Sequence, residues 1–202
     1  SPDNRFVVVS TGDFNGSSGQ AQVWNPNTAE RVGTPLKHKG GVISASFSSD
    51  CRRVVTASMD DTAQVWDVQT SAKFGPALQH RADVVHASFS PDDRYLVTAS
   101  FDQTAVIWDV QSSKKLATLR HSSYVNHARF SADGKYVVTA CPDGRARVWY
   151  LAPNAAKQME DLQQAPFGPE LVAVLDHGGH LQQASFNATG DHVVTVGYYV
   201  PK

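Results

Sequence analysis

The sequence predicts an all-β fold built from several small antiparallel sheets of one repeated design. Three stretches of the chain align almost residue for residue, and each contains short β-branched runs bounded by turn-forming residues. The gaps between the runs of one stretch are too short for a helix of three turns. These features favour stacked antiparallel sheets and exclude the strand and helix alternation that a parallel sheet needs.

The three complete repeats begin at Phe47, Phe89 and Phe130, so they are 42 and 41 residues apart. They read FSSDCRRVVTASMDDTAQVWDV, FSPDDRYLVTASFDQTAVIWDV and FSADGKYVVTACPDGRARVWYL. Two incomplete copies flank them, SPDNRFVVVST from Ser1 and FNATGDHVVTVG from Phe186. A fixed period of this length indicates one small structural unit per repeat.

Each repeat is expected to hold about four short strands. The first clear strands cover 54–57, 95–98 and 136–139, where Val, Tyr, Leu and Thr predominate. Tight hairpins are expected at Asp60-Asp61, Asp102-Gln103 and Asp143-Gly144, each followed by a strand that ends at a Trp. One such sheet cannot bury both of its apolar faces, so the repeats must stack on one another.

The period and the closing Trp-Asp resemble the WD-repeat β-propeller family over nearly the whole chain. Trp66-Asp67 and Trp108-Asp109 keep the full dipeptide, whereas Trp24 and Trp149 keep only the Trp. The resemblance implies radially stacked blades of four antiparallel strands, here forming an incomplete arc. The expected divisions are partial repeat 1–36, repeats 37–78, 79–119 and 120–175 with an insertion at 153–169, and partial repeat 176–202.

Four residue types recur with fixed spacing in the complete repeats. His to Asp is 22 residues, Thr to Asp is 4 and Asp to Trp is 6 each time. The sets, called tetrads below, are His38, Thr56, Asp60, Trp66; His80, Thr98, Asp102, Trp108; and His121, Thr139, Asp143, Trp149. A His, hydroxyl and Asp set could form a catalytic relay, but an active site is needed once, and this pattern occurs in every complete repeat. The resemblance implies that each tetrad is a hydrogen-bonded brace within one blade.

The incomplete repeats depart from the tetrad pattern. Val9 stands where Thr is due, and Trp24 lies 11 residues after Asp13. In the last copy His177 and Thr195 are present, but Tyr199 replaces the Asp. These two tetrads are not expected to close. Within the insertion, Asn154 is expected to cap a short helix over 155–164, which either contacts a partner or packs on its own blade.

Composition and motifs argue against several classes of function. Lys and Arg total 18 against 19 Asp and Glu, so neither nucleic acid nor an anionic membrane is an expected partner. His177 and His180 have no third metal ligand nearby, and no phosphate-binding loop or nucleophile elbow is present. We therefore expect no catalysis, no metal and no cofactor. Cys51 and Cys141 have neither zinc nor redox spacing, and as free thiols they favour a reducing, cytoplasmic location.

Partners are expected on the narrow top face, where the tetrad loops lie in the resembled family. That face is lined by residues three and five after each tetrad His and by the residue before each tetrad Asp. The expected partner-binding residues are Ile43, Met59, Asp83, Val85, Phe101, Tyr124, Asn126, His180, Gln182 and Tyr198. Apolar and aromatic side chains at such positions are typical of protein interfaces, although they could also fold inward and plug the central channel.

The expected function is that of a non-catalytic scaffold or recognition module for proteins or peptides, in a signalling or regulatory setting. The alternative is an enzyme or a small-ligand sensor with its site at the mouth of the central channel. Because the first copy starts inside a repeat motif, the chain is expected to be part of a larger multidomain protein whose parent chain supplies further blades.

Overall fold

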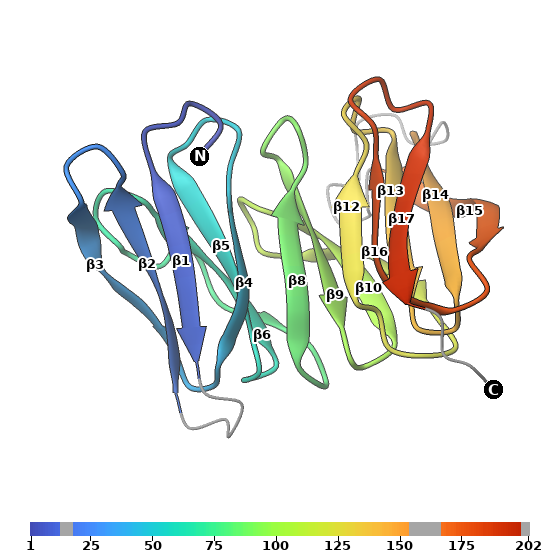
Figure 1. Ribbon diagram of the computed structural model, residues 1–202, viewed down its shortest axis with the longest axis horizontal. Coiled ribbons are helices and arrows are strands. Elements are labelled where there is room, and N and C mark those ends of the chain that lie inside the picture. The colour runs from blue at the N-terminus through green and yellow to red at the C-terminus, as the bar shows by residue number, and fades with distance from the viewer. Residues whose placement is uncertain (13–17, 154–166, 199–202) are drawn as a thin grey trace.

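The computed structural model describes residues 1–12, 18–153 and 167–198. All the regular secondary structure in that part of the chain is β-strand. The strands form five antiparallel sheets arranged side by side in an arc (Figure 1). The predicted all-β fold is confirmed. The same residues contain no helix long and apolar enough to cross a lipid bilayer.

The sheets follow the repeats in chain order. The first contains β1 (Val7–Gly12), β2 (Gly19–Asn25) and β3 (Glu30–His38). The second contains β4 (Val42–Phe47), β5 (Arg53–Ser58), β6 (Thr62–Asp67) and β7 (Leu78–Gln79), and the third contains β8 (Val84–Phe89), β9 (Tyr95–Ser100), β10 (Thr104–Asp109) and β11 (Lys115–Arg120). The fourth contains β12 (His127–Phe130), β13 (Tyr136–Cys141), β14 (Arg145–Pro153) and β15 (Phe167–Asp176), and the fifth contains β16 (His180–Phe186) and β17 (Val193–Tyr198).

The expected insertion helix lies outside the described residues. The strands around it are longer than the sequence suggested, because β14 runs to Pro153 and β15 already begins at Phe167. These two strands pair along their whole length, from Arg145 opposite Asp176 to Pro153 opposite Phe167. Residues 167–169 therefore belong to the fourth sheet.

The first strands of the last four sheets, β4, β8, β12 and β16, lie next to one another and are called the inner strands (Figure 1). They run in the same direction, so all of them begin on one face of the arc and finish on the opposite face. We call the end at which the inner strands begin the tetrad face, which lies along the lower edge of Figure 1. We call the end at which they finish, at Phe47, Phe89, Phe130 and Phe186, the Phe face.

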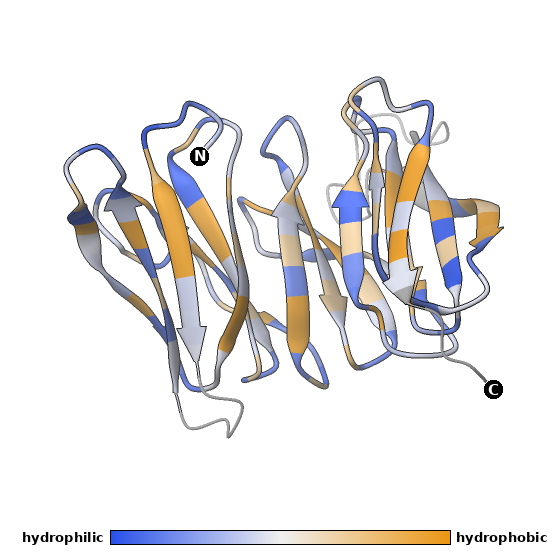
Figure 2. Ribbon diagram, in the orientation of Figure 1, coloured by the Kyte–Doolittle hydropathy of each residue, from blue (hydrophilic) through white to orange (hydrophobic). Residues whose placement is uncertain are grey.

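The core lies between sheets, so successive residues of a strand face different neighbours. In β9, Leu96 packs with Val55 of the second sheet, whereas Val97 packs with Val137 of the fourth sheet. Both β9 residues are fully buried. Strands buried on both faces read as continuous apolar runs, and Figure 2 shows hydrophobic residues gathered in the strands and hydrophilic ones in the turns.

The outward faces of the first and last sheets differ from this core. Val7 and Val9 on β1 and Val194 and Val196 on β17 are exposed large apolar side chains. In the central sheets the valines of the corresponding strands β5, β9 and β13 are buried. Both ends of the arc therefore present apolar surface to solvent.

The tight hairpins that the sequence predicts bring the tetrad residues together. In each hairpin the residue after the tetrad Asp has a left-handed backbone, at Asp61 (φ 66°), Gln103 (φ 70°) and Gly144 (φ 80°). This conformation suits glycine and costs an L-residue with a Cβ about 1–2 kcal/mol.

Candidate functional site

The tetrad of the second sheet is a continuous hydrogen-bonded chain. The Trp66 indole Nε1 donates to Thr56 Oγ1 at 2.8 Å, and Thr56 Oγ1 lies 2.7 Å from His38 Nε2. His38 Nδ1 lies 2.9 Å from Asp60 Oδ2. The chain links the end of β3, the two strands β5 and β6, and the hairpin between them.

The tetrad of the third sheet repeats this geometry. Trp108 Nε1 donates to Thr98 Oγ1 at 2.9 Å, and Thr98 Oγ1 is 2.7 Å from His80 Nε2. His80 Nδ1 is 2.9 Å from Asp102 Oδ2. The two sets superpose in sequence and in bonding, as expected of a structural element that each sheet needs once.

The protonation states follow from burial and partners. Burial lowers the pKa of His38 and His80, although Asp60 and Asp102 oppose the effect, so both rings are neutral at pH 7. A carboxylate only accepts, so His Nδ1 carries the proton and His Nε2 accepts from the Thr hydroxyl. Burial raises the pKa of Asp60, but hydrogen bonds from Thr62, Lys39 and His38 outweigh it and hold this pKa below its usual value.

The direction of these bonds is the one found in a catalytic relay, but here the Thr hydroxyl is not accessible from solvent. The Thr56 and Thr98 side chains are fully buried, and each hydroxyl oxygen already accepts an indole N–H. A nucleophile must reach its substrate. In this geometry the hydroxyl ties strands together instead of facing a substrate.

The tetrad of the fourth sheet closes differently from the expectation. Trp149 Nε1 donates to Thr139 at 3.1 Å, and Thr139 lies 2.8 Å from His121 Nε2. His121 Nδ1, however, lies 3.1 Å from the Leu119 carbonyl oxygen and not on Asp143.

Arg147 explains this change. Its guanidinium donates to Asp143 Oδ2 at 2.6 Å, and Ser122 Oγ donates to the same oxygen at 3.0 Å. Gln64 occupies the position of Arg147 in the second sheet, and Val106 occupies it in the third. A charged guanidinium binds a carboxylate more strongly than a neutral imidazole does. Asp143 therefore pairs with Arg147, and His121 bonds to the Leu119 carbonyl instead.

The pKa values of Asp143 and His121 reflect this change of partner. Burial raises the pKa of Asp143, but the bonds from Arg147 and Ser122 outweigh it and hold this pKa at about 2. Burial, followed by the nearby Arg147 charge, lowers the pKa of His121 to about 4. The fourth brace therefore keeps a neutral imidazole and gains an ion pair.

The two incomplete tetrads do not form the four-residue chain in the described residues. Trp24 packs against Arg31, whose guanidinium carbon lies 5.3 Å from the indole centroid. His177 is exposed and its Nδ1, not Nε2, lies 3.1 Å from Thr195 Oγ1. Asp13 and Tyr199 lie outside the described residues.

An exposed aromatic pair stands on the tetrad face. The rings of Phe101 and Tyr124 have centroids 4.9 Å apart with an interplanar angle of 59°. Phe101, in the turn after β9, is 44% exposed, and Tyr124, in the loop before β12, is 37% exposed. Ile43, which occupies the expected lining position of β4, is 41% exposed. We call Ile43, Phe101 and Tyr124 the apolar surface.

The backbone beneath the aromatic pair is held in place. Phe101 N donates to the Asp83 carbonyl at 3.0 Å, and Val125 N donates to the Ser100 carbonyl at 3.0 Å. The Cys141 thiol donates to the Tyr124 carbonyl at 3.2 Å. These bonds hold the backbone that carries both rings.

The other expected lining residues have varied environments. The Asn126 amide donates to the Leu181 carbonyl at 2.8 Å, and Val85 packs against the core between the third and fourth sheets. Burial, followed by the Asp61 charge, raises the pKa of Asp83. The remaining lining residues are Met59 and His180, which are half-buried, Gln182, which is exposed, and Tyr198, which ends β17.

Sequence reasoning missed a polar row on the inner strands. His86 and His127 occupy the same register in β8 and β12, and their ring centroids are 3.9 Å apart. In the described part of the chain, the Nδ1 atoms of both rings and Ser44 Oγ are buried without a hydrogen-bond partner. Comparing the repeats column by column could have found this row, because Ser44, His86, His127 and Gln183 stand at one repeat position.

Burial keeps the histidine pair neutral. It lowers the pKa of His127 to about 4, and the nearby Arg129 charge acts in the same direction. The pKa of His86 is held well below its usual value by burial, then by His127 and Arg129. Buried unpaired polar atoms of this kind are sites for ordered water.

A comparison with family models places the chain in a known group. The model described as Eukaryotic translation initiation factor eIF2A matches residues 27–150, more than half of the chain. The matched segment contains all three complete tetrads and the residues of the apolar surface. No curated protein matches the chain. By its sequence match and its arc of antiparallel sheets of β-propeller type, the chain belongs to the eukaryotic translation initiation factor eIF2A family.

Proposed function

We propose that this chain is a non-catalytic interaction module of the WD-repeat type that holds a protein partner against the apolar surface of Ile43, Phe101 and Tyr124. The observation that carries the proposal is the pair of exposed rings, which contact each other at a tilted angle. Aromatic residues that stay partly exposed on a rigid base are the usual anchors of protein interfaces. Full burial of a large apolar side chain contributes about 1.5–3 kcal/mol, and the part still exposed here contributes about half of that for each ring.

Pre-organisation supports the same proposal. The bonds at Phe101 N, Val125 N and the Cys141 thiol hold the two loops in the conformation that presents the rings. A surface that is already ordered loses little conformational entropy when a partner binds. The rings therefore contribute most of their contact energy to affinity.

The charges of the surface favour a protein over a nucleic acid. The expected lining positions contain no Lys or Arg, and the chain carries a net charge of -1. The description of the family names a translation initiation factor, so we propose a protein that acts in translation initiation as the partner. The buried free thiols Cys51 and Cys141 support a reducing, cytoplasmic location.

The test is capture of a partner by the full chain and by matched variants. The variant Phe101→Ala with Tyr124→Ala removes both rings from the apolar surface, and it is expected to lose the captured protein while its unfolding midpoint changes little. The control is Leu171→Ala with Val174→Ala, which removes equally exposed apolar groups from β15. Loss of the partner in the control, or its retention by the first variant, would contradict the proposal.

A further inference from the structure

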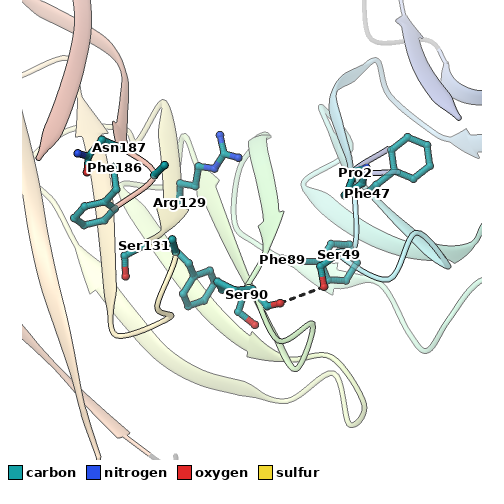
Figure 3. A pocket seen from close by; sticks show the side chains of 13 residues that line it. Pro2, Phe47, Ser49, Phe89, Ser90, Arg129, Ser131, Phe186 and Asn187 are labelled. Atoms are coloured by element: carbon teal, nitrogen blue, oxygen red, sulfur yellow. Dashed lines mark hydrogen bonds between the residues drawn. The ribbon is translucent and has the colours of Figure 1, made fainter. Parts of the chain in front are cut away.

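The Phe face contains a cavity that the tetrads and the apolar surface do not use. Its volume is about 360 Å³, and it opens where the four inner strands finish (Figure 3). Phe47, Phe89, Phe130 and Phe186, one from each inner strand, line it together with Arg129. A volume of this order holds a small ligand or one or two residues of a peptide.

Arg129 breaks the repeat pattern at this cavity. Its position in β12 is occupied by Ser46 in β4, Ser88 in β8 and Ser185 in β16. Ser46 Oγ donates to the Ala87 carbonyl at 2.9 Å and Ser88 Oγ donates to the Ala128 carbonyl at 3.3 Å, so these serines join neighbouring inner strands. An arginine at this position is too long for that bond and extends into the space between Phe186 and Phe47 (Figure 3).

Arg129 is exposed, and its guanidinium has no ion pair or hydrogen bond with any described residue. The carboxylates of the nearby turns accept hydrogen bonds from their own turn or from the adjoining one. Asp92 accepts from Ser90 Oγ and Arg94 N, and Asp133 accepts from Ser131 Oγ and Lys135 N. The guanidinium of Arg129, with its five N–H donors, therefore lines the cavity without a counter-ion among the described residues.

We propose that this cavity is a second binding site, which takes a carboxylate carried on an aromatic body. The carboxylate pairs with the Arg129 fork, because a guanidinium binds a carboxylate through two parallel hydrogen bonds. The aromatic body packs against the Phe rings of the wall. A monoanion fits better than a doubly charged phosphate, because the aspartates of the adjoining turns repel negative charge.

Two sources share this chemistry, a free aromatic acid and the C-terminal aromatic residue of a polypeptide. Isothermal titration of the full chain with N-acetyl-phenylalanine, its neutral amide and the peptide Gly-Gly-Gly-Phe separates them. We expect both acids, or one of them, to bind and the amide to bind at least about 10-fold more weakly. Tighter binding of the peptide identifies a chain terminus as the ligand, and tighter binding of the small acid identifies a free acid.

The variant Arg129→Ser tests the role of the guanidinium. It places the residue of the other inner strands at this position, so it is expected to fold, and to bind the acid at least about 10-fold more weakly. The control Arg94→Ser removes one positive charge from the same face outside the cavity wall and should leave binding unchanged. The proposal is overturned if no acid binds, if acid and amide bind equally, or if Arg129→Ser binds as the native chain does.

Discussion

Replacing Thr98 by Val tests the bracing role of the tetrads. Valine keeps the shape of threonine but removes the hydroxyl that joins Trp108 to His80. Both partners are almost fully buried, so water cannot replace the lost bonds. Leaving a buried donor or acceptor unpaired costs about 1–3 kcal/mol for each group.

The extra methyl of valine returns about 0.8 kcal/mol through burial. For two unpaired groups the net loss in unfolding free energy is then about 1–5 kcal/mol. The same change at Thr139 should cost less, about 1–2 kcal/mol, because His121 and Trp149 are only half-buried and water reaches them.

The assay is urea unfolding at pH 7 followed by circular dichroism, with the slope of the transition compared between variants. Thr118→Val is the control, because Thr118 on β11 is half-buried and its hydroxyl bonds to no described residue. The reasoning is refuted if Thr98→Val is no more costly than the control, or if Thr139→Val is the more costly of the two tetrad variants.

Three other measurements address the histidine pair, the hairpins and the thiols. Because burial lowers the pKa of His127 to about 4, the unfolded chain binds more protons between about pH 4 and 6.5, and the unfolding free energy falls as pH falls through that window. His127→Gln, which copies Gln183, should reduce this pH dependence without abolishing it, because burial also lowers the pKa values of the tetrad histidines and of His86; an unchanged profile would contradict the assignment. Gln103→Gly should raise the unfolding free energy by about 0.5 kcal/mol, because it relieves the left-handed backbone (φ 70°), and calorimetry would reveal a fall instead. Cys51 and Cys141 are buried, so an aromatic disulfide reagent should label neither until urea unfolds the chain.

The repeat pattern predicted most of the fold because it is a property of many residues at once. The runs around Val55, Val97 and Val138 reappear as strands buried on both faces, and the hairpins after Asp60 and Asp102 bring the tetrads together. Such features survive single substitutions. The extent of β14 and β15 was less visible, since residues 167–169 carry no clear strand signal but are held by pairing with β14.

The differences between the predicted and the observed sites come from single residues whose effect the repeat pattern does not predict. Arg147 redirects Asp143, because a charge-assisted bond outcompetes a neutral one. Arg129 places an exposed guanidinium where the other repeats have serine. Neither residue disturbs the period, so only the three-dimensional neighbours reveal its effect. The exposure of Phe101 and Tyr124 was expected, but their ring contact joins two repeats and required the structure.

The most direct test of the proposed interaction module is hydrogen–deuterium exchange of the full chain with and without its captured partner. Burial slows amide exchange and local opening speeds it. The segments in which exchange slows therefore locate the contact without any substitution. The account predicts protection concentrated in the segments 42–44, 100–104 and 122–126, which carry Ile43, Phe101 and Tyr124. Protection confined to the outer strands β11 and β15, with those three segments unchanged, would contradict it.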